Sequence, residues 1–471
     1  MKTKHFFIAL FSLSLIATSC SSDDDGTKTP AATPNIVELA QETPSLSSLV
    51  AALLRADGDL ATVLSGNGPF TVLAPTNDAF AAFLSDNGFA SLEEVPTDVL
   101  SQVLLNHVIM ADVSASDLVS LGSGYTSGSA TGAGDENISI YFDATNGVTF
   151  NNVATVTAAD VSASNGTVHI IDAVLGLPSI VDLAVANSDF SNLVAALGSA
   201  DGDLVNVLSG DGPFTVLAPT NAAFNTFLDG TALGDVDTAA LSQILLNHVI
   251  IGSPITSTAL VDLEAGYTNT GATGPGENAL SLYYNTTNGV MFNGISSVIQ
   301  ADVIGTNGII HAVDTVIDIP TVVTFALADP TFSTLVEALT TLTPATDFAA
   351  VLSRTETGNS DNLNPDFTVF APTNDAFAAL AAVPEEGPLT QILLHHVIKE
   401  ANITSSMLNN PGDTTATTIE GDDITITLPG TGNNIANITD GSGATDIGII
   451  AVDVQAGNGV IHAINKVMIN N

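Results

Sequence analysis

Hydrophobic residues are spaced first as in helices and then as in β-strands along residues 35–178. From Asn35 to Ala56 the apolar positions recur every three or four residues, with a break at Pro44, which predicts two helices. Phe70–Leu73 is an apolar run ended by a proline turn, which predicts a strand. Helices followed by antiparallel strands are typical of an α+β domain whose helices lie on one side of a sheet.

The remaining apolar segments extend this order of elements. Asp59–Leu64 predicts a further helical turn, and Thr76 or Asn77 can cap the helix that follows it. Thr97 begins another helix, whose apolar stripe reaches His107. The later segments predict strands separated by tight turns: Ile138–Phe142, Val148–Phe150 and Thr167–Leu175, with turns at Asn146-Gly147 and Asn165-Gly166.

The same series of patterns occurs three times. The sequence FTVLAPTN stands at Phe70–Asn77 and again at Phe214–Asn221, 144 positions later, and FTVFAPTN follows at Phe367–Asn374. A period of this size is that of a domain and not that of a solenoid turn. We therefore expect three domains, which we call repeats 1, 2 and 3, over residues 35–178, 179–320 and 321–471.

Three ordered motifs carry a family resemblance. FTVLAPTNDAF, the histidine of LLNHVI and NGTVHIIDAVL resemble the first motif, the central histidine motif and the second motif of the fasciclin (FAS1) domain. The resemblance implies three wedge-shaped domains, each with two β-sheets packed with a helical layer, and a function in adhesion. The residues that carry the motifs are Thr76, His107 and His169, then Thr220, His248 and His311, then Thr373, His396 and His462.

The repeats also depart from the pattern. Ala222 replaces the acidic residue at Asp78 and Asp375, and Asn465 replaces the aspartate that closes the second motif in the other repeats. Animal members commonly have Tyr-His at the central motif, whereas Asn106 precedes the histidine here, so integrin recognition through that tyrosine is not expected. Repeat 3 also contains an Asn/Asp/Ser-rich insertion, Arg354–Pro365, which predicts an exposed loop.

The N-terminus predicts export and lipid anchoring. Residues 1–19 have two lysines and a twelve-residue apolar run, too short to span a bilayer, and end just before Cys20, the only cysteine. This segment resembles a bacterial lipoprotein signal, although its lipobox lacks the usual leucine; an ordinary signal peptide is the alternative. The acidic run Asp23, Asp24 and Asp25 resembles the surface-export signal of Bacteroidetes lipoproteins, or is a solvated part of the tether at residues 20–34.

Charge restricts the partners. Seven basic residues against fifty acidic ones give a net charge of −43, and Arg55 is the only basic residue between Ile36 and Pro320. Nucleic acid is therefore excluded as a partner, because binding it requires Lys and Arg to neutralise phosphates. Direct binding to anionic lipid or polysaccharide is also opposed unless a divalent cation bridges, and the only expected membrane contact is the lipid anchor.

Histidines are the first candidates for chemistry. His107, His248 and His396 fall on apolar helix stripes, and His169, His311 and His462 fall in apolar strands, which favours hydrogen-bonded core residues over metal ligands. No repeat offers a cysteine ligand, and no G-x-S-x-G occurs. Since Asp172 and Asp314 correspond to Asn465, that position suits a structural hydrogen bond better than proton transfer. We expect no catalytic, cofactor or metal site.

Other motifs have simple interpretations. Two glycine-rich segments, Gly122–Gly134 and Gly266–Gly276, predict loops between strands, with Tyr125 and Tyr267 as exposed aromatic residues for glycan or partner contact. Asp57-Gly58-Asp59 and its counterpart in repeat 2 could contribute to a Ca²⁺ site but more simply cap the next helical turn.

These observations favour a surface-anchored, non-enzymatic lipoprotein of the outer membrane. It would attach the cell to another cell, a matrix or a polysaccharide through weak tandem modules. One alternative is a structural spacer or accessory subunit of a surface complex. A more distant one is a hydrolase with a histidine/carboxylate cleft.

Overall fold

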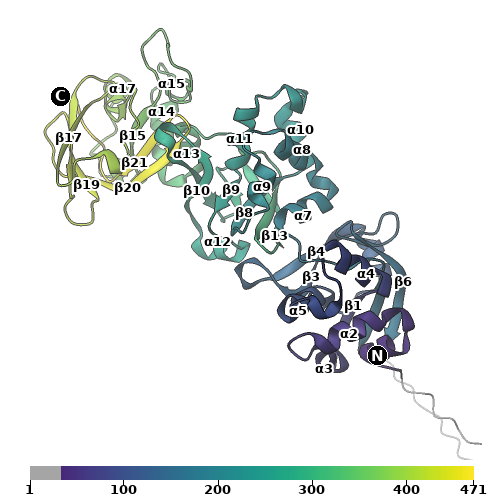
Figure 1. Cartoon of the computed structure of the whole chain (residues 1–471). Coiled ribbons are helices and arrows are strands. Elements are labelled where there is room, and N and C mark those ends of the chain that lie inside the picture. The colour runs from purple at the N-terminus through teal and green to yellow at the C-terminus, as the bar shows by residue number, and fades with distance from the viewer. Residues whose placement is uncertain (1–32, 471) are drawn as a thin grey trace, which may run out of the picture.

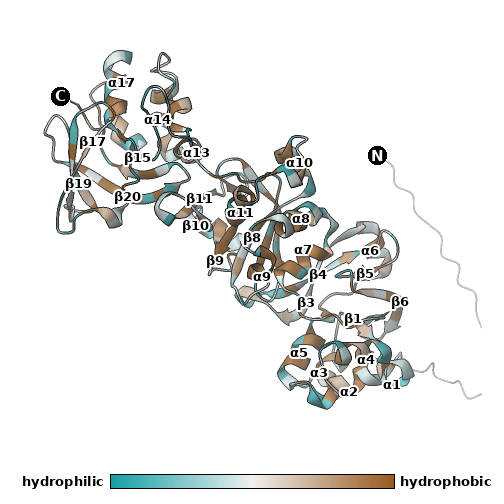
Figure 2. Ribbon diagram, turned by 45° about the horizontal axis from the view of Figure 1, so that its top comes forward, coloured by the Kyte–Doolittle hydropathy of each residue, from teal (hydrophilic) through white to brown (hydrophobic). Residues whose placement is uncertain are grey.

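The computed structural model describes residues 33–470, which form three domains in a row (Figure 1). Cys20, Asp23, Asp24 and Asp25 lie outside the described residues. Each domain is an α+β unit with one seven-stranded sheet and most of its helices gathered on one side of it. The most apolar segments lie in the helices and inner strands of each domain (Figure 2).

The elements follow the same order in every repeat. Repeat 1 contains α1 (Ile36–Glu42), η1 (Pro44–Leu46), α2 (Ser47–Arg55), α3 (Leu60–Ser65), β1 (Phe70–Pro75), α4 (Asn77–Asp86), η2 (Leu92–Glu94), α5 (Thr97–Leu105), β2 (Val108–Ile109), α6 (Ala115–Leu121), β3 (Ser123–Thr131), η3 (Ala133–Asp135), β4 (Asn137–Asp143), β5 (Thr149–Phe150), β6 (Ala154–Ala163) and β7 (Gly166–Ile171). Repeat 2 contains α7 (Ile180–Ala186), η4 (Ser188–Phe190), α8 (Ser191–Ser199), α9 (Leu204–Leu208), β8 (Phe214–Pro219), α10 (Asn221–Leu228), η5 (Leu233–Asp235), α11 (Thr238–Leu246), β9 (Val249–Ile251), α12 (Ser257–Leu263), β10 (Ala265–Thr273), η6 (Pro275–Glu277), β11 (Ala279–Asn285), β12 (Met291–Phe292), β13 (Ser296–Ile304) and β14 (Gly308–Val313).

Repeat 3 has the same strands and fewer helices within the described residues. It contains α13 (Val322–Ala328), η7 (Pro330–Phe332), α14 (Ser333–Thr340), α15 (Phe348–Leu352), β15 (Phe367–Pro372), α16 (Asn374–Ala378), α17 (Glu386–His395), β16 (Val397–Ile398), η8 (Ser405–Met407), β17 (Gly412–Thr417), β18 (Asp423–Leu428), β19 (Ala436–Thr439), β20 (Ile447–Ala456) and β21 (Gly459–Ile464). The insertion predicted between α15 and β15 is a largely exposed loop, in which the Arg354 guanidinium pairs with Asp361.

The sheet of repeat 1 has the strand order β2-β1-β7-β6-β5-β4-β3. Only β1 and β7 are parallel, with Val72 opposite Val168, and all other neighbours are antiparallel. Two register shifts interrupt the pairing of β6 with β7. Bulges increase the twist and bending of a strand. The long, bent β6 therefore pairs with β7 at one side and with β5 at the other, and so joins the two sheets expected from the fasciclin resemblance into one continuous strand order.

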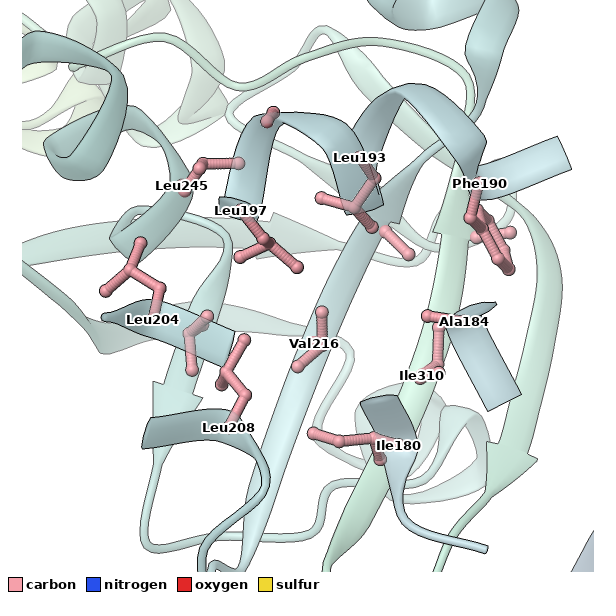
Figure 3. Packing of buried hydrophobic residues seen from close by; sticks show 14 of the residues in the cluster. Ile180, Ala184, Phe190, Leu193, Leu197, Leu204, Leu208, Val216, Leu245 and Ile310 are labelled. Atoms are coloured by element: carbon pink, nitrogen blue, oxygen red, sulfur yellow. The ribbon is translucent and has the colours of Figure 1, made fainter. Parts of the chain in front are cut away.

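Each repeat has two cores, one on each side of its central strands. In repeat 1, Phe70 and Val72 of β1 face the helices, whereas Leu73 lies in a second cluster with Ile140 and Phe150 from β4 and β5. Figure 3 shows the helix-facing cluster of repeat 2, where Val216 and Ile310 contact leucines of α8 and α9. A strand buried on both faces does not alternate with exposed polar residues, which explains why FTVLAP is apolar apart from the buried Thr71.

The prediction of glycine-rich loops is wrong. Residues 123–131 and 265–273 form the nine-residue strands β3 and β10, which pair with the following strand and have one irregularity, between Ser127 and Thr131 or between Asn269 and Thr273. Their glycines and small polar residues are required by close neighbours: a Cβ on Gly128 would lie 2.8 Å from the Asn106 amide oxygen. Composition typical of a loop therefore reflects crowding against the end of α5 and not a lack of strand structure.

Within residues 33–470, no single helix has the length and apolar character needed to cross a membrane. Two helix pairs pass that test jointly, but each is bent by about a right angle, at 100° and 94°. Both pairs supply core residues of their own domains, such as Leu183 and Phe325.

Candidate functional site

The central histidine of each repeat lies just beyond the end of a helix. The prediction that it lies on the apolar stripe of that helix is wrong. Helix α5 ends at Leu105, and the amide of His107 donates to the Leu104 carbonyl in the turn that follows. Its Nδ1 lies 2.7 Å from the Val103 carbonyl oxygen, and its Nε2 accepts from the Leu175 amide at 2.9 Å. The same two contacts recur for His248, with Ile244 and Ile317, and for His396, with Ile392 and Met468.

This geometry fixes the protonation state of the ring. A carbonyl accepts from Nδ1 and an amide donates to Nε2, so the ring is neutral with its proton on Nδ1. Burial lowers the pKa of His107, His248 and His396 to about 4. A charged ring at these positions would lose its hydration, and no nearby charge is strong enough to compensate for that loss. Each ring therefore connects the end of a helix to the segment after the last strand.

The second histidine of each repeat is held by the bulged strand. The His169 Nε2 lies 2.9 Å from the Val113 carbonyl, and its Nδ1 accepts from the Asp160 amide at 3.2 Å. Asp160 has a positive φ of 56°, and its carboxylate accepts from the Ala115 amide at the start of α6. His311 and His462 have the equivalent contacts, and burial lowers the pKa of both. Thus the rings and the bulge position one another.

Both ring nitrogens of all six motif histidines are bonded to the backbone. A metal ligand or general base needs a nitrogen lone pair free to face a ligand or substrate. The arrangement is that of structural core histidines and provides no reactive nitrogen.

The Thr-Asn pair of the first motif connects a strand to two helices. The Thr76 hydroxyl accepts from the Ala79 amide and caps α4, as Thr220 and Thr373 do in their repeats. Asn77 has a different function: its Oδ1 accepts from the Ser48 amide at 2.8 Å, and its Nδ2 donates to the Pro44 carbonyl. Sequence reasoning missed this link, although the asparagine is present in all three motifs.

The asparagine of the last turn is a second internal link. Asn165 donates to the carbonyls of Leu64 and Gly66 at the end of α3 and accepts from the Ile36 amide at the start of α1. Asn307 and Asn458 repeat all three bonds. The sequence predicted only a tight turn here, because the residues joined are about 100 or more positions away.

The acidic motif positions have structural functions as well. Asp172 accepts from the Thr155 amide at 2.6 Å, Asp314 from Ser297, and Asn465 from Gly448 through its amide oxygen. Since only one acceptor oxygen is needed, asparagine can replace aspartate at this position.

The Asp-Gly-Asp segment does not cap helix α3 with its side chain. Asp59 occupies the N-cap position at a φ of 52° without a capping bond, and it accepts from the Thr62 hydroxyl instead. Asp57 accepts from the Thr97 hydroxyl. The two carboxylates thus contact different helices.

One cluster of metal-type side chains occurs among the described residues. His395, Glu420 and Asp422 place one ligand atom each within 4.8 Å of one another. However, the Gly441 amide donates to His395 Nε2 at 3.1 Å, so the neutral ring carries its proton on Nδ1, which lies 3.5 Å from a Glu420 oxygen. These bonds favour a histidine–carboxylate pair over cation coordination through Nδ1. The sequence did not predict this cluster, because the acids come from a turn more than twenty residues after His395.

The prediction that Tyr125 and Tyr267 are exposed aromatic residues for glycan or partner contact is wrong. Each is only partly exposed and packs against the core of the following repeat. Their hydroxyls bond to Asn187 and Asp329, respectively, and burial raises the pKa of both phenols.

Two of the cavities among the described residues are small and apolar, whereas a wider and more polar hollow of about 350 Å³ is lined by residues of both repeat 1 and repeat 2, such as Asn152 and Asp182. Equivalent cavities of about 60 and 70 Å³ lie under the helical layers of repeats 2 and 3, lined by residues such as Val181 and Leu197 or Val323 and Leu339. Neither contains a converging set of polar groups of the kind that catalysis needs.

The fold and its motif contacts define an array of fasciclin-type modules, and the family comparison agrees. The Fasciclin domain profile matches residues 44–178, 188–320 and 330–470, so the chain belongs to the fasciclin domain family.

Relatives include animal and cyanobacterial proteins. Protein sll1483 of Synechocystis is 39% identical over 140 residues, covering 30% of this chain and 72% of that protein. Periostin of Homo sapiens is 28% identical over 71% of this chain, and transforming growth factor-beta-induced protein ig-h3 of Sus scrofa is 27% identical over 93%. This chain spans 37% and 58% of the lengths of those two proteins.

Among solved structures, the FAS1 domain pair of the insect cell adhesion molecule fasciclin I is similar at 20% sequence identity, with a TM-score of 0.38. The match covers 59% of this chain and 97% of that one.

Proposed function

We propose that this protein is a non-enzymatic adhesion protein that attaches the cell surface to an extracellular protein or polysaccharide. The observation that carries the proposal is the presence of three fasciclin domains in one chain. The domains resemble the modules of adhesion proteins. The ring nitrogens of all six motif histidines are engaged in internal hydrogen bonds, which leaves none of them available for catalysis. Binding through the outer surfaces is therefore favoured over a hydrolase with a histidine/carboxylate cleft.

Tandem modules suit weak adhesion. When one module binds, the linked modules are held at high effective concentration near further ligands, which raises overall avidity without a strong individual site. The net charge of −43 opposes anionic partners and nucleic acid and favours neutral or basic ones.

We further propose lipid anchoring at Cys20 and display on the outer membrane surface, with Asp23–Asp25 as the export signal. The motif order at the N-terminus supports this proposal. The acyl chains would be the only membrane contact, and residues 21–34 would separate the first domain from the membrane.

A structural spacer within a surface complex is the second candidate. The hydrogen bonds between successive repeats favour it, because a stiff array can hold another protein at a fixed distance from the membrane.

Whole-cell attachment distinguishes these functions. Cells displaying the full chain are compared with cells displaying chains that lack repeat 3 or repeats 2 and 3, on immobilised extracellular proteins and neutral or acidic glycans. Adhesion predicts a stepwise loss of attachment, whereas a spacer predicts no attachment by any of the chains. The full chain with Cys20→Ala is the control for anchoring, and surface labelling with Asp23–Asp25 replaced by alanine tests export.

Two additions test the remaining alternatives. Attachment is measured with Ca²⁺ and with chelator. Binding to acidic glycans in chelator would contradict the expected exclusion of anionic partners, whereas calcium-dependent binding would indicate that a divalent cation bridges the acidic surface to the glycan. Hydrolysis of the bound glycan or protein by the full chain would contradict the non-enzymatic proposal.

A further inference from the structure

Successive repeats contact one another through the same pair of strands. The Ser139 hydroxyl of β4 accepts from the Ile304 amide of repeat 2 at 2.9 Å, and the Ser281 hydroxyl of β11 accepts from the Gln455 amide of repeat 3 at 3.0 Å. The serines are equivalent in strand register, and the two amides belong to the same position of the bulged strand. One geometry is therefore used twice.

A tyrosine pair lies beside each of these serines. Tyr125 and Tyr141 are opposite one another on β3 and β4, with ring centroids 5.3 Å apart, and Tyr267 and Tyr283 repeat the pair at 5.0 Å. The side-chain amide of Asn187 donates from Nδ2 to the Tyr125 hydroxyl. Asn187 lies in the corner after α7, the first helix of repeat 2.

The second pair meets the same corner of repeat 3. Tyr267 stacks edge-on against Phe325 at 5.7 Å, and its hydroxyl donates to Asp329 at 3.0 Å. Each pair thus combines apolar burial with one directed hydrogen bond to the following repeat.

The hairpin tip that follows the pair approaches the next repeat closely. A Cβ on Gly132 would lie 2.7 Å from the Gly305 carbonyl oxygen of repeat 2, and a Cβ on Gly274 would lie 2.8 Å from that of Ala456 in repeat 3. The Ala133 amide also donates to Gly305. Only glycine fits at these contacts without displacing the neighbouring repeat.

Repeat 3 lacks this docking face on its outer side. Following the strand register from β21 through β20, β19 and β18 to β17 places Thr415 and Thr425 at the tyrosine-pair positions, opposite one another, and Asp423 at the serine position. Thr425 is half-buried and Thr415 and Asp423 are exposed, whereas Tyr141 and Ser139 are buried. A polar pair thus replaces the aromatic one on this face of repeat 3.

Repeat 1 shows the complementary change on the face that would receive a preceding repeat. Glu42 stands where repeats 2 and 3 have Ala186 and Ala328, and exposed Ser162 stands where they have buried Ile304 and Gln455. These substitutions are those of terminal modules whose outer faces contact water.

We propose that the three repeats form one closed strut, in which the tyrosine-pair face docks only onto the helix corner of the following repeat and both outer faces are polar ends. The inner contacts hold the repeats at fixed angles. The ends accept neither a further fasciclin repeat nor a second copy of this chain. The strut would set the orientation of any binding surface relative to the membrane, whichever partner is bound.

Spin-label distances test the fixed angles. In the full chain with Cys20→Ser, the only thiols are those introduced, because Cys20 is the sole cysteine. Pairs are placed on equivalent exposed helix positions, Ala81→Cys with Asn225→Cys across repeats 1 and 2, and Asn225→Cys with Ala378→Cys across repeats 2 and 3. Pulsed electron paramagnetic resonance then gives a distance distribution for each pair.

We expect one narrow distribution for each pair in the parent chain. Tyr267→Ala should broaden the distribution across repeats 2 and 3 and leave that across repeats 1 and 2 narrow. The matched control, Thr415→Ala at the equivalent outer position, should change neither. Broad distributions in the parent, or no broadening with Tyr267→Ala, would overturn the proposal. If circular dichroism shows that this variant is unfolded, Gly274→Val, which places a side chain against repeat 3, replaces it with the same expectation.

Analytical ultracentrifugation of the same parent chain tests the closed ends. The expected result is the mass of one chain at every concentration. A concentration-dependent dimer, with labels showing repeat 3 of one chain beside repeat 1 of another, would overturn the closed-end part of the proposal.

Discussion

The buried central histidines should make each repeat sensitive to mild acid. His248 is 2% exposed, with Nδ1 donating to the Ile244 carbonyl and Nε2 accepting from the Ile317 amide. Protonation would place a second hydrogen on Nε2, facing the Ile317 N–H, and would charge a buried ring. Burial therefore lowers its pKa from 6.5 to about 4.

The sign and size of the effect follow from proton linkage. Between pH 6.5 and pH 4 the unfolded repeat binds a proton at this ring and the folded repeat does not, so stability is complete above pH 6.5 and decreases as the pH falls. A depression from 6.5 to about 4 corresponds to roughly 3 kcal/mol when the loss is complete. At pH 5 the loss is about 2 kcal/mol for repeat 2 from this ring alone.

Hydrogen exchange of the full chain measures this loss repeat by repeat, because a three-domain chain need not unfold in one step. Opening free energies are obtained at pH 7.5 and pH 5.0 from peptides of β14 and α11, after correction for the intrinsic pH dependence of exchange. His248→Gln provides the matched control, since it lacks the titrating ring while all carboxylates stay. The parent should lose about 2 kcal/mol more than the variant in repeat 2.

Two results would refute this reasoning. One is an imidazole nitrogen titration, measured by NMR, that places the pKa of His248 near 6.5 in the folded chain. The other is an equal loss of opening free energy in the parent and in His248→Gln.

Three further changes test the internal links. Asn307→Ala removes three hydrogen bonds that join α7, α9 and β14, and should destabilise repeat 2 by roughly 3 kcal/mol in urea unfolding; a loss below about 1 kcal/mol would contradict the assigned function. Asp172→Asn should leave repeat 1 within about 0.5 kcal/mol of the parent, whereas Asp172→Ala should cost about 1 kcal/mol; equal losses would show that charge matters and not the acceptor oxygen. Thr215→Val removes the hydrogen bonds of this hydroxyl to the Ser253 carbonyl and the Ile255 amide and should cost roughly 2–3 kcal/mol, while Thr215→Ser, which retains both bonds, should cost about 1 kcal/mol; hydrogen exchange of β8 and β9 distinguishes the two.

The repeated motifs predicted much of the local structure, because local signals controlled it. Pro44 separates α1 from α2, Thr76 caps α4, and the Asn-Gly turn at 165–166 precedes β7, as predicted from neighbouring residues alone. The apolar run Phe70–Leu73 is a strand buried on both faces. Threefold recurrence also established the fasciclin family before any contact was known.

Strands without an apolar pattern were not predictable in the same way. β3 and β10 consist largely of glycine, serine, threonine and asparagine, so periodicity gave no signal, and their strand structure depends on pairing with β4 and β11. The bulged β6 was also missed, because most of its side chains face solvent.

The sequence by itself therefore determined the number of domains, the α+β class and the order of most elements, since these depend on spacing between near neighbours. Only the tertiary structure decided what the polar motif residues do. It assigned His107, Asn77 and Asn165 to internal hydrogen bonds with partners distant in sequence. It also moved Tyr125 and Tyr267 from an expected ligand surface to the contacts between repeats. A side chain's partner is set by how strands and domains come together in space, and that information is not local to the residue.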